Sequence, residues 1–266
     1  KIGRGLIQSW NNGEIEKIIG YMSENVVVTS PHIKLFYPLN NDNKIVGKVK
    51  LSEYWKNLVQ IGGNFKLTLI EFKKETYLAI KRGISLNPIL NSFQLTVNKY
   101  NISHDLIDAF FNSMKMDLTK ATYDEAGYNA YIYGSAEVVG LMCLFVFCDG
   151  DRAMYDKLKP TAQQLGAAFQ KINFLRDVKA DYEQLSRTYF PGVDFKNFTP
   201  AMKKQIEDDI ANDFAEAYKG ILQLPAKARF GVYVAYKYYL SLFKKVKKTK
   251  PANILDQRIR IPNYIK

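Results

Sequence analysis

One amide and two carboxylates recur at helical spacing late in the chain. Asn173, Asp177 and Asp181 stand four residues apart, so at about 3.6 residues per turn they line one face of a helix. The apolar approach to them carries no charge apart from Lys171, and carboxylates beside an apolar surface are costly unless a cation neutralises them. Oxygen donors of this kind suit Mg²⁺, which is usually held by one or two carboxylates and substrate phosphates. A solvated helix face is the alternative interpretation of the same spacing.

The sequence around these residues, INFLRDVKADYEQLSRTYFP, resembles the second acidic motif of the squalene/phytoene synthase family, the head-to-head prenyl diphosphate synthases. Other stretches resemble the family in the same order: MKMDL, YIYGSAEVVGLM, LPAKARFGVYVAYKYYLSLFKKV and the late QRIRIP. The resemblance covers about residues 72–266 and is closest to bacterial phytoene synthases. It implies a mainly α fold, the all-α helical bundle of isoprenoid synthases. It also implies Mg²⁺-dependent 1′–1 condensation of two prenyl diphosphates, with geranylgeranyl diphosphate to phytoene expected, in carotenoid or isoprenoid biosynthesis.

The same resemblance assigns roles to individual residues. Asp177 and Asp181 would be catalytic, and together with Asn173 they would hold Mg²⁺ on the diphosphates. Contacts to the prenyl diphosphate substrates are implied for Arg187, Tyr189, Tyr239 and Arg258. Arginine suits this task because it is planar and permanently charged. A structural ion pair of Arg187 with Asp181 or Glu183 is the alternative for that residue.

Two further acids are candidates for substrate binding. Glu137 lies in GSAEVVG, where small residues permit close helix approach, and the resemblance places such a helix beside the substrate cavity. Asp117 lies in MKMDL and is a similar case. For both acids, a structural hydrogen bond remains the alternative to a role at the substrate.

The helices that must position these residues are predicted from about Phe72 onward. Apolar residues recur there at helical spacing, and no strand pattern competes. Helix starts are indicated at Asn87–Pro88, at Ser103 and at Thr199–Pro200. Three more helices are expected over Tyr123–Phe147, over Pro160–Leu185 and from Pro225 to Val246.

Residues 1–71 follow a different pattern. Helical spacing over Gly5–Ser23 is followed by β-branched Val26–Val28, and the alternation in Phe65–Ile70 predicts another strand. A short helix is expected after Gly47. This order resembles the first half of an NTF2-like (SnoaL-like) α+β domain, so we expect a partial domain of that kind over residues 1–71 and the helical domain over residues 72–266.

The family's first acidic motif, a second DxxxD on an earlier helix, is not found before Phe72. We therefore expect a chimera of two truncated domains in one chain, with impaired synthase activity. The alternative function is that of a non-catalytic fusion or remnant whose NTF2-like segment binds a ligand or a partner. His32 and His104 lack partners at triad or metal spacing, which argues against hydrolase and zinc chemistry.

The formal net charge of +12 is concentrated at the end of the chain, where the last thirty residues carry nine basic groups and one acidic group. No nucleic-acid motif accompanies them, so an anionic lipid surface or a diphosphate is the expected partner, and nucleic acid is not. The apolar run Tyr131–Cys148 contains Glu137, which favours a core helix over a membrane span. With no apolar leader at the start and two unbridged cysteines, we expect a cytoplasmic protein with peripheral contact to the inner face of the membrane.

Overall fold

The structure is a computed structural model that describes residues 27–29, 44–47, 49–54, 56, 69–120, 122–185, 188–254 and 259. The backbone alone is described for residues 27–29, 44, 119, 180–185 and 196. By internal contacts the chain divides into two compact units, Lys1–Ile102 and Ser103–Lys266. Each unit is therefore considered by itself.

The described part of the first unit contains a small two-stranded sheet and helical segments. Strands β1 (Val27–Thr29) and β2 (Lys44–Val46) pair antiparallel, with Val28 opposite Ile45. Helical residues 49–54 follow Gly47, as predicted, and Leu51 and Tyr54 are fully buried. Most of residues 1–71 lie outside the described residues, so the NTF2-like segment and the boundary at Phe72 stay predictions.

Helix α5 (Leu69–Arg82) corrects one expectation, because Leu69 and Ile70 begin a helix where the alternation predicted a strand. Two or three alternating residues cannot distinguish the two structures, and the amphipathic pattern that follows decides for helix. Helix α6 (Pro88–Tyr100) begins as predicted, with the Asn87 side chain accepting from the amides of Ile89 and Leu90.

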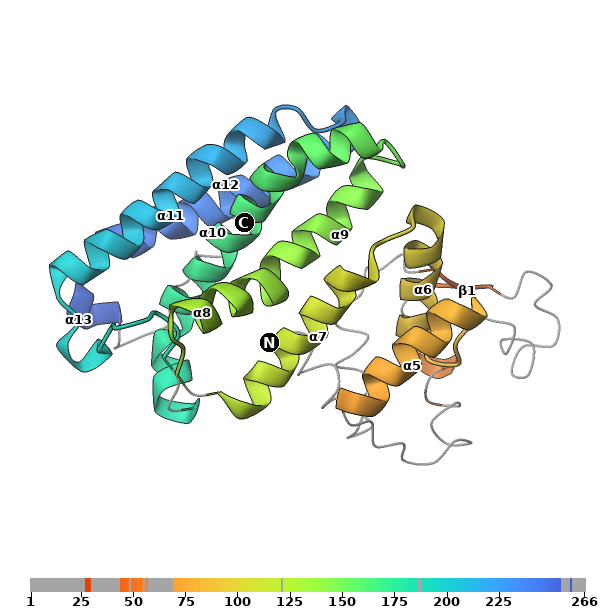
Figure 1. The fold of residues 1–266 in the computed structure, drawn as a ribbon, viewed down its shortest axis with the longest axis horizontal. Coiled ribbons are helices and arrows are strands. Elements are labelled where there is room, and N and C mark those ends of the chain that lie inside the picture. Colours follow the sequence, from red (N-terminus) through yellow and green to blue (C-terminus); the bar gives the residue numbers. More distant parts are fainter. Residues whose placement is uncertain are drawn as a thin grey trace. The chain divides into compact units, whose positions relative to one another are not determined.

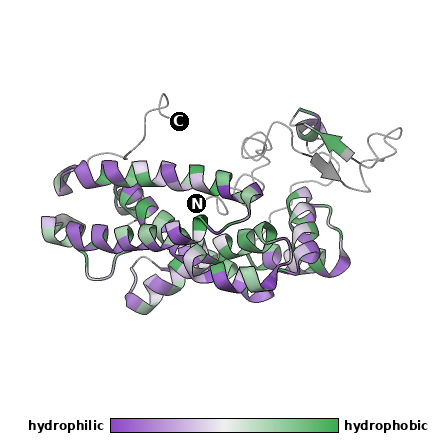
Figure 2. Cartoon of the chain, turned by 90° about the horizontal axis from the view of Figure 1, so that it is seen from above, coloured by the Kyte–Doolittle hydropathy of each residue, from purple (hydrophilic) through white to green (hydrophobic). Residues whose placement is uncertain are grey.

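The described part of the second unit is all helical (Figure 1). Its elements, in chain order, are α7 (His104–Thr119), α8 (Glu125–Ile132), the π-helical turn η1 (Tyr133–Glu137), α9 (Val138–Phe147), α10 (Arg152–Leu185), the 3-10 turn η2 (Phe195–Asn197), α11 (Pro200–Ile221), α12 (Ala226–Lys248) and α13 (Pro251–Ile254). This confirms the predicted all-α bundle. Figure 2 shows hydrophobic and hydrophilic residues interspersed along these helices.

The long helix α10 is the centre of this unit, since α8, η1, α9, α11, α12 and α13 all pack on it. The sequence predicted that it begins at Pro160, but it begins at Arg152 and continues through that proline. Pro160 is the ninth residue of α10, so the helix lacks the hydrogen bond that an N–H at this position would donate to the carbonyl of Asp156. The core around α10 is rich in buried aromatic and aliphatic side chains, among them Ile172, Leu175 and Phe174.

Glycines allow α10 and α7 to approach the π turn closely. A Cβ atom on Gly166 of α10 would lie 2.8 Å from the Cα atom of Glu137. A Cβ atom on Gly134 of η1 would lie 2.4 Å from the carbonyl oxygen of Ala109 in α7. Both distances are shorter than real Cβ contacts, so the three elements can only pack in this way with glycine at both positions.

Within the described residues, one helical run, Glu125–Phe147, is long and apolar enough to cross a membrane. In the structure this run is α8, η1 and α9, which pack against α7 and α10. Val138 and Leu141 are completely buried in that packing. The run therefore packs into the bundle along one side, and 39% of its most apolar window is buried.

Candidate functional site

Asp177 is the buried acid of the candidate site. It is 3% exposed, so the solvated helix face does not describe this residue. The guanidinium of the neighbouring Arg176 donates to both of its oxygens, from Nε at 3.2 Å to Oδ1 and from Nη2 at 2.8 Å to Oδ2. Burial lowers the pKa of Arg176, but its hydrogen bonds to Asp177 and Tyr239 and the charge of Asp177 raise that pKa overall.

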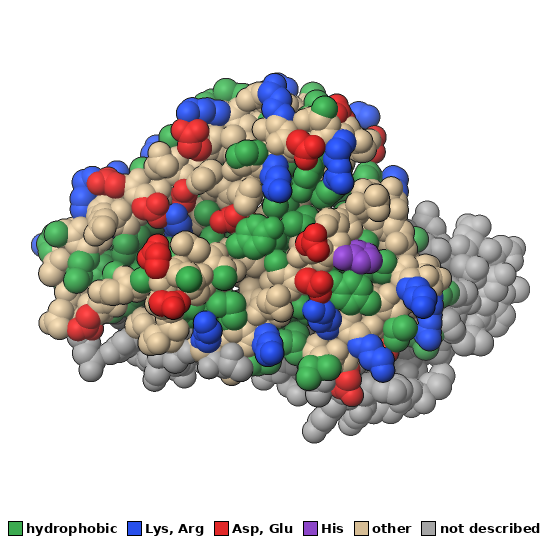
Figure 3. Space-filling view, in the orientation of Figure 1, with side chains coloured by type: hydrophobic (Ala, Val, Ile, Leu, Met, Phe, Trp, Pro, Cys, Tyr) green, Lys and Arg blue, Asp and Glu red, His purple; other side chains and the backbone are tan. Residues whose placement is uncertain are grey.

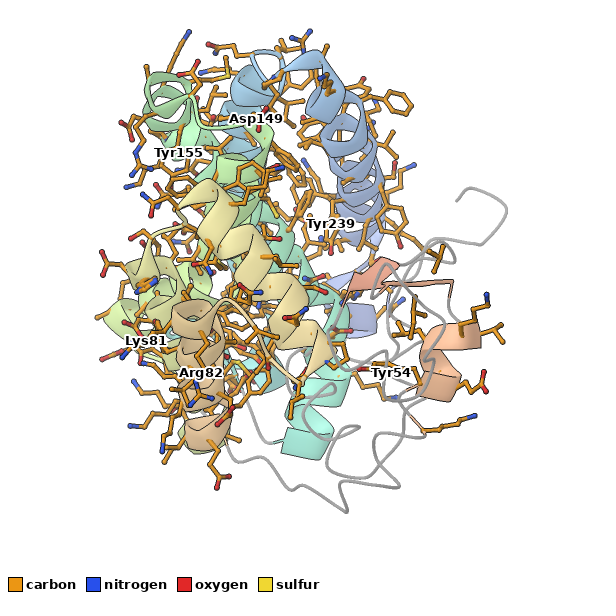
Figure 4. The ribbon with its side chains drawn as sticks, turned by 90° about the vertical axis from the view of Figure 1, so that its right-hand side faces the viewer. Tyr54, Lys81, Arg82, Asp149, Tyr155 and Tyr239 are labelled. Atoms are coloured by element: carbon orange, nitrogen blue, oxygen red, sulfur yellow. The ribbon has the colours of Figure 1, made fainter. Side chains whose placement is uncertain are left out.

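Asn173 lies one turn before Asp177 and faces α12. The Tyr239 hydroxyl donates to Asn173 Oδ1 at 3.4 Å, and the Tyr239 ring stacks on Phe169 with 3.9 Å between centroids. Figure 4 shows Tyr239 extending from α12 toward α10. The structure thus brings together Asn173, Asp177 and Tyr239, and it adds Arg176, which the spacing of the acids did not single out.

The candidate ligand atoms are oxygens, which is the type of ligand that a hard cation such as Mg²⁺ prefers. Asp177 and Asn173 offer carboxylate and amide oxygens on one helix face, and the long Tyr239 contact leaves the Asn173 oxygen weakly engaged. Asp181 belongs to the same helix, but its side chain lies outside the described residues, as do Arg187 and Arg258. Among side chains that the structure describes, no three acids, histidines or cysteines are grouped as a metal site. The Mg²⁺ ligand set stays a prediction.

Tyr189 lies in an aromatic cluster of the core. Its ring stacks on Phe174 at 4.0 Å between centroids and lies 5.6 Å from the ring of Tyr123. Tyr131 joins the same cluster and donates its hydroxyl to Asp117 at 2.9 Å. Asp117 therefore has the structural hydrogen bond that was the alternative for it.

Glu137 also has a structural partner. Gln163 of α10 donates to Glu137 Oε2 at 2.8 Å. Burial raises the pKa of the Glu137 carboxyl, and the Gln163 hydrogen bond partly opposes that shift. Direct roles of Glu137, Asp117 and Tyr189 at a substrate remain predictions.

The structure adds a second acidic pair that the sequence analysis missed. Asp209 and Asp213 of α11 have the same DxxxD spacing, and both accept from Lys171 of α10, at 2.5 Å and 2.8 Å. Asp213 and Lys171 are buried. The sequence feature that could have indicated this pair is Lys171, because it is the one charged residue in the apolar stretch that precedes Asn173. Here the cation that pairs with both acids is a side chain of the protein itself, Lys171.

Comparisons with known proteins agree with this architecture. The model of the squalene/phytoene synthase family matches residues 59–264. A bifunctional lycopene cyclase/phytoene synthase from Blakeslea trispora is 26% identical over an alignment of 168 residues, which covers 55% of this chain and 27% of that protein. The chain thus spans about a quarter of that relative's length.

A solved structure shares the fold. The crystal structure of squalene synthase HpnC from Alicyclobacillus acidocaldarius superposes with a TM-score of 0.62 at 16% identity, over 91% of this chain and 94% of that one. The helical bundle built around α10 is that of the isoprenoid synthases, a fold of prenyltransferase-type enzymes. The chain belongs to the squalene/phytoene synthase family.

Proposed function

We propose that this chain binds prenyl diphosphates through Mg²⁺ held by Asn173, Asp177 and Asp181, as a synthase of the head-to-head type. The observation that carries the proposal is Asp177, a buried carboxylate that lies one helical turn after the Asn173 amide on the same face of α10. Arg176 balances the charge of Asp177 in the structure, so a metal ion there would require the additional negative charge that a diphosphate brings. A diphosphate with its metal would fit a site of this composition.

The protein's own groups would divide the work at the substrate. Asp177 and Asn173 supply oxygen donors. Arg176 uses two of its five N–H groups on Asp177 and hydrogen-bonds Tyr239 as well, and its remaining N–H groups could donate to a phosphate oxygen. The stacked rings of Phe169 and Tyr239 form an electron-rich apolar wall next to these donors, suited to an allylic carbocation. When bound, Mg²⁺ would neutralise the departing diphosphate.

Geranylgeranyl diphosphate is the proposed substrate and phytoene the proposed product. The phytoene synthase named above supports this choice, and the squalene synthase HpnC, whose likeness is in fold alone, leaves it open. No glycine-rich dinucleotide motif is found in the sequence, and only squalene-type chemistry needs a nicotinamide reductant.

We further propose that turnover by this 266-residue chain is impaired. Two substrates need two carboxylate sets, and the other DxxxD pair in the sequence, Asp209 and Asp213, is already engaged by Lys171. Misplacement of one substrate typically costs orders of magnitude in rate. The alternative, a non-catalytic chain whose first segment binds a ligand or partner, is favoured by the same shortage of acids.

Calorimetry with a non-hydrolysable geranylgeranyl thiodiphosphate, with and without Mg²⁺, tests the site. We expect weak binding that requires Mg²⁺ and is lost in the Asp177→Asn, Asp181→Asn double variant. The matched control is Asp208→Asn, an exposed acid on α11 that pairs with exposed Lys204. Equal, metal-independent binding by the double variant would refute the assignment.

Turnover is measured in parallel by product formation from labelled geranylgeranyl diphosphate, next to a family member that has both motifs. We expect no appreciable phytoene from this chain. A comparable rate would show that other residues supply the second carboxylate set. It would refute the proposed impairment but not the proposed diphosphate site.

A further inference from the structure

One face of α12 is exposed along the whole helix and has an unusual composition. Its residues, at helical spacing, are Lys227, Phe230, Tyr233, Val234, Lys237, Ser241, Lys244, Lys245 and Lys248. The opposite face, with Tyr236, Phe243 and Val246, is buried against the bundle. From Phe230 to Lys248 the exposed face extends about 27 Å, since an α-helix rises about 1.5 Å per residue.

The first half of this face is apolar. Phe230 is 76% exposed and Val234 is 50% exposed. Tyr233 continues the surface toward α11, because its ring lies 6.5 Å from that of Tyr218, and Leu222 at the end of α11 is 51% exposed. Single exposed apolar residues are ordinary, but a group of them at the ends of two adjacent helices marks an interaction surface.

The second half of the face is basic. Lys237, Lys244 and Lys248 are all exposed, and α12 contains no aspartate or glutamate in its 23 residues. By contrast, the face of the molecule in Figure 3 mixes acidic with basic side chains. A single sign of charge beside exposed aromatic residues is the pattern of helices that lie in the interface of an anionic bilayer.

We propose that α12 docks this protein onto an anionic lipid bilayer, with the helix parallel to the surface. Phe230, Tyr233 and Val234 enter the boundary between headgroups and acyl chains, and the lysines contact the lipid phosphates. The stems of the lysines let their charged ends reach the headgroups while the helix lies deeper. A nucleic acid would match the charge but leaves Phe230 and Val234 without a role. This inference does not depend on the proposed diphosphate site.

Co-sedimentation with vesicles of phosphatidylcholine, with and without about 30 mol% of anionic phosphatidylglycerol, tests the proposal. We expect binding only to the anionic vesicles, weakened by salt. The Lys244→Gln, Lys248→Gln variant should bind about thirtyfold more weakly, at about 1 kcal/mol per lysine. Phe230→Ser should bind about tenfold more weakly through its lost apolar contact.

Two control variants separate this surface from general charge and hydrophobicity. Lys157→Gln, Lys159→Gln removes the same charge from exposed positions of α10, and Leu95→Ser removes an exposed apolar side chain from α6. Both should bind anionic vesicles as the unchanged protein does. The emission that the Phe230→Trp variant has in excess of the unchanged protein, which already contains Trp10 and Trp55, should shift to the blue with vesicles and be quenched by brominated lipid.

Several results would overturn the proposal. These are no binding to anionic vesicles, an equal loss in the α10 control, or an unshifted emission of the Phe230→Trp variant at saturating lipid. Binding of a DNA duplex that depends on Lys244 and Lys248, without vesicle binding, would instead assign the face to nucleic acid.

Discussion

Arg176 makes the buried position of Asp177 tolerable, because it donates to both carboxylate oxygens. Removing one member of a buried ion pair costs more than the pair contributes, since the other charge is left without compensation. A metal ion at Asp177 would offer the same compensation. The stability of variants at these two positions should therefore respond to divalent cations.

We expect Arg176→Met to lower the free energy of unfolding by roughly 2–4 kcal/mol, as measured by urea denaturation. Millimolar Mg²⁺ should recover part of this loss. In the Arg176→Met, Asp177→Asn double variant the loss should be smaller, and Mg²⁺ should have no effect. A double variant as unstable as Arg176→Met would mean that Arg176 stabilises the fold by packing and not by neutralising Asp177.

Asp213 is the second residue whose environment should have a measurable effect, in this case on the pH dependence of stability. Burial raises the pKa of its carboxyl to about 6, with Lys171 opposing the shift and the charge of Asp209 adding to it. Because this folded-state pKa lies above that of the unfolded chain, the folded protein binds more protons between about pH 4 and pH 6. The protonated Asp213 carboxyl therefore stabilises the folded protein at low pH, and this stabilisation is lost as the pH rises through this window.

Asp213→Asn should remove that part of the pH dependence. In the unchanged protein we expect the Asp213 carboxyl to lower the free energy of unfolding by roughly 1–3 kcal/mol as the pH rises from 4 to 6. The difference in this free energy between the variant and the unchanged protein should change over the same pH range. Asp208→Asn, an exposed acid of the same helix, serves as the control and should leave the profile unchanged. An identical slope in Asp213→Asn would show that the carboxyl is ionised throughout.

At the scale of elements, the approach of α10 to the π turn has a direct test. Gly166→Ala places a methyl group 2.8 Å from the Cα atom of Glu137 and should destabilise the fold by roughly 1–3 kcal/mol. Gly231→Ala is the matched control, because nothing lies within 4 Å of its Cβ position in α12. There alanine should stabilise by about 0.5–1 kcal/mol through its helix propensity. Thermal unfolding followed by circular dichroism measures both, and a neutral Gly166→Ala would mean that α10 can shift away from the turn.

Helix starts with local signals were predicted correctly. Asn87 and Thr199 accept from backbone amides of the helices that follow them, and each is followed by proline at the first position. Ser103 precedes α7 as predicted but makes no capping hydrogen bond. The π turn was not predicted, because it depends on the packing of α7 and α10 around Gly134 and Gly166, and no local pattern in the sequence specifies it.

The candidate site was predictable where it lies within one helix and not where it joins two. The spacing of Asn173 and Asp177 is local and indicated a shared face. The bonds from Lys171 to Asp209 and Asp213 join residues about forty positions apart, and that acidic pair has the same local spacing as Asp177 and Asp181. Which cation meets which pair depends on how α10 and α11 pack.

The whole chain consists of two units, and its two tryptophans, Trp10 and Trp55, both precede the division at residue 102. Tryptophan fluorescence therefore reports on the first unit, whereas far-ultraviolet ellipticity is dominated by the long helices of the second. If the units unfold independently, as separate cores permit, the two signals follow different transitions.

We expect Gly166→Ala to shift the ellipticity midpoint in urea to lower concentration while the fluorescence midpoint stays unchanged. Gly231→Ala should move the ellipticity midpoint slightly the other way. Coincident transitions that shift together in Gly166→Ala would show that the two units unfold as one cooperative structure.

The π turn at Tyr133–Glu137 also suggests how the helical run from α8 to α9 gained a residue. A π turn accommodates one residue more than an α-helix needs to span the same rise, so the faces of α8 and α9 keep their relation despite the extra residue. We therefore expect that the segment arose as a one-residue insertion in an α-helix. We expect an alignment with relatives whose helix is unbroken to open a single gap within residues 133–137. Deleting Ser135, whose buried hydroxyl has no hydrogen-bond partner in the described part of the chain, should then leave a continuous α-helix with both flanks in register.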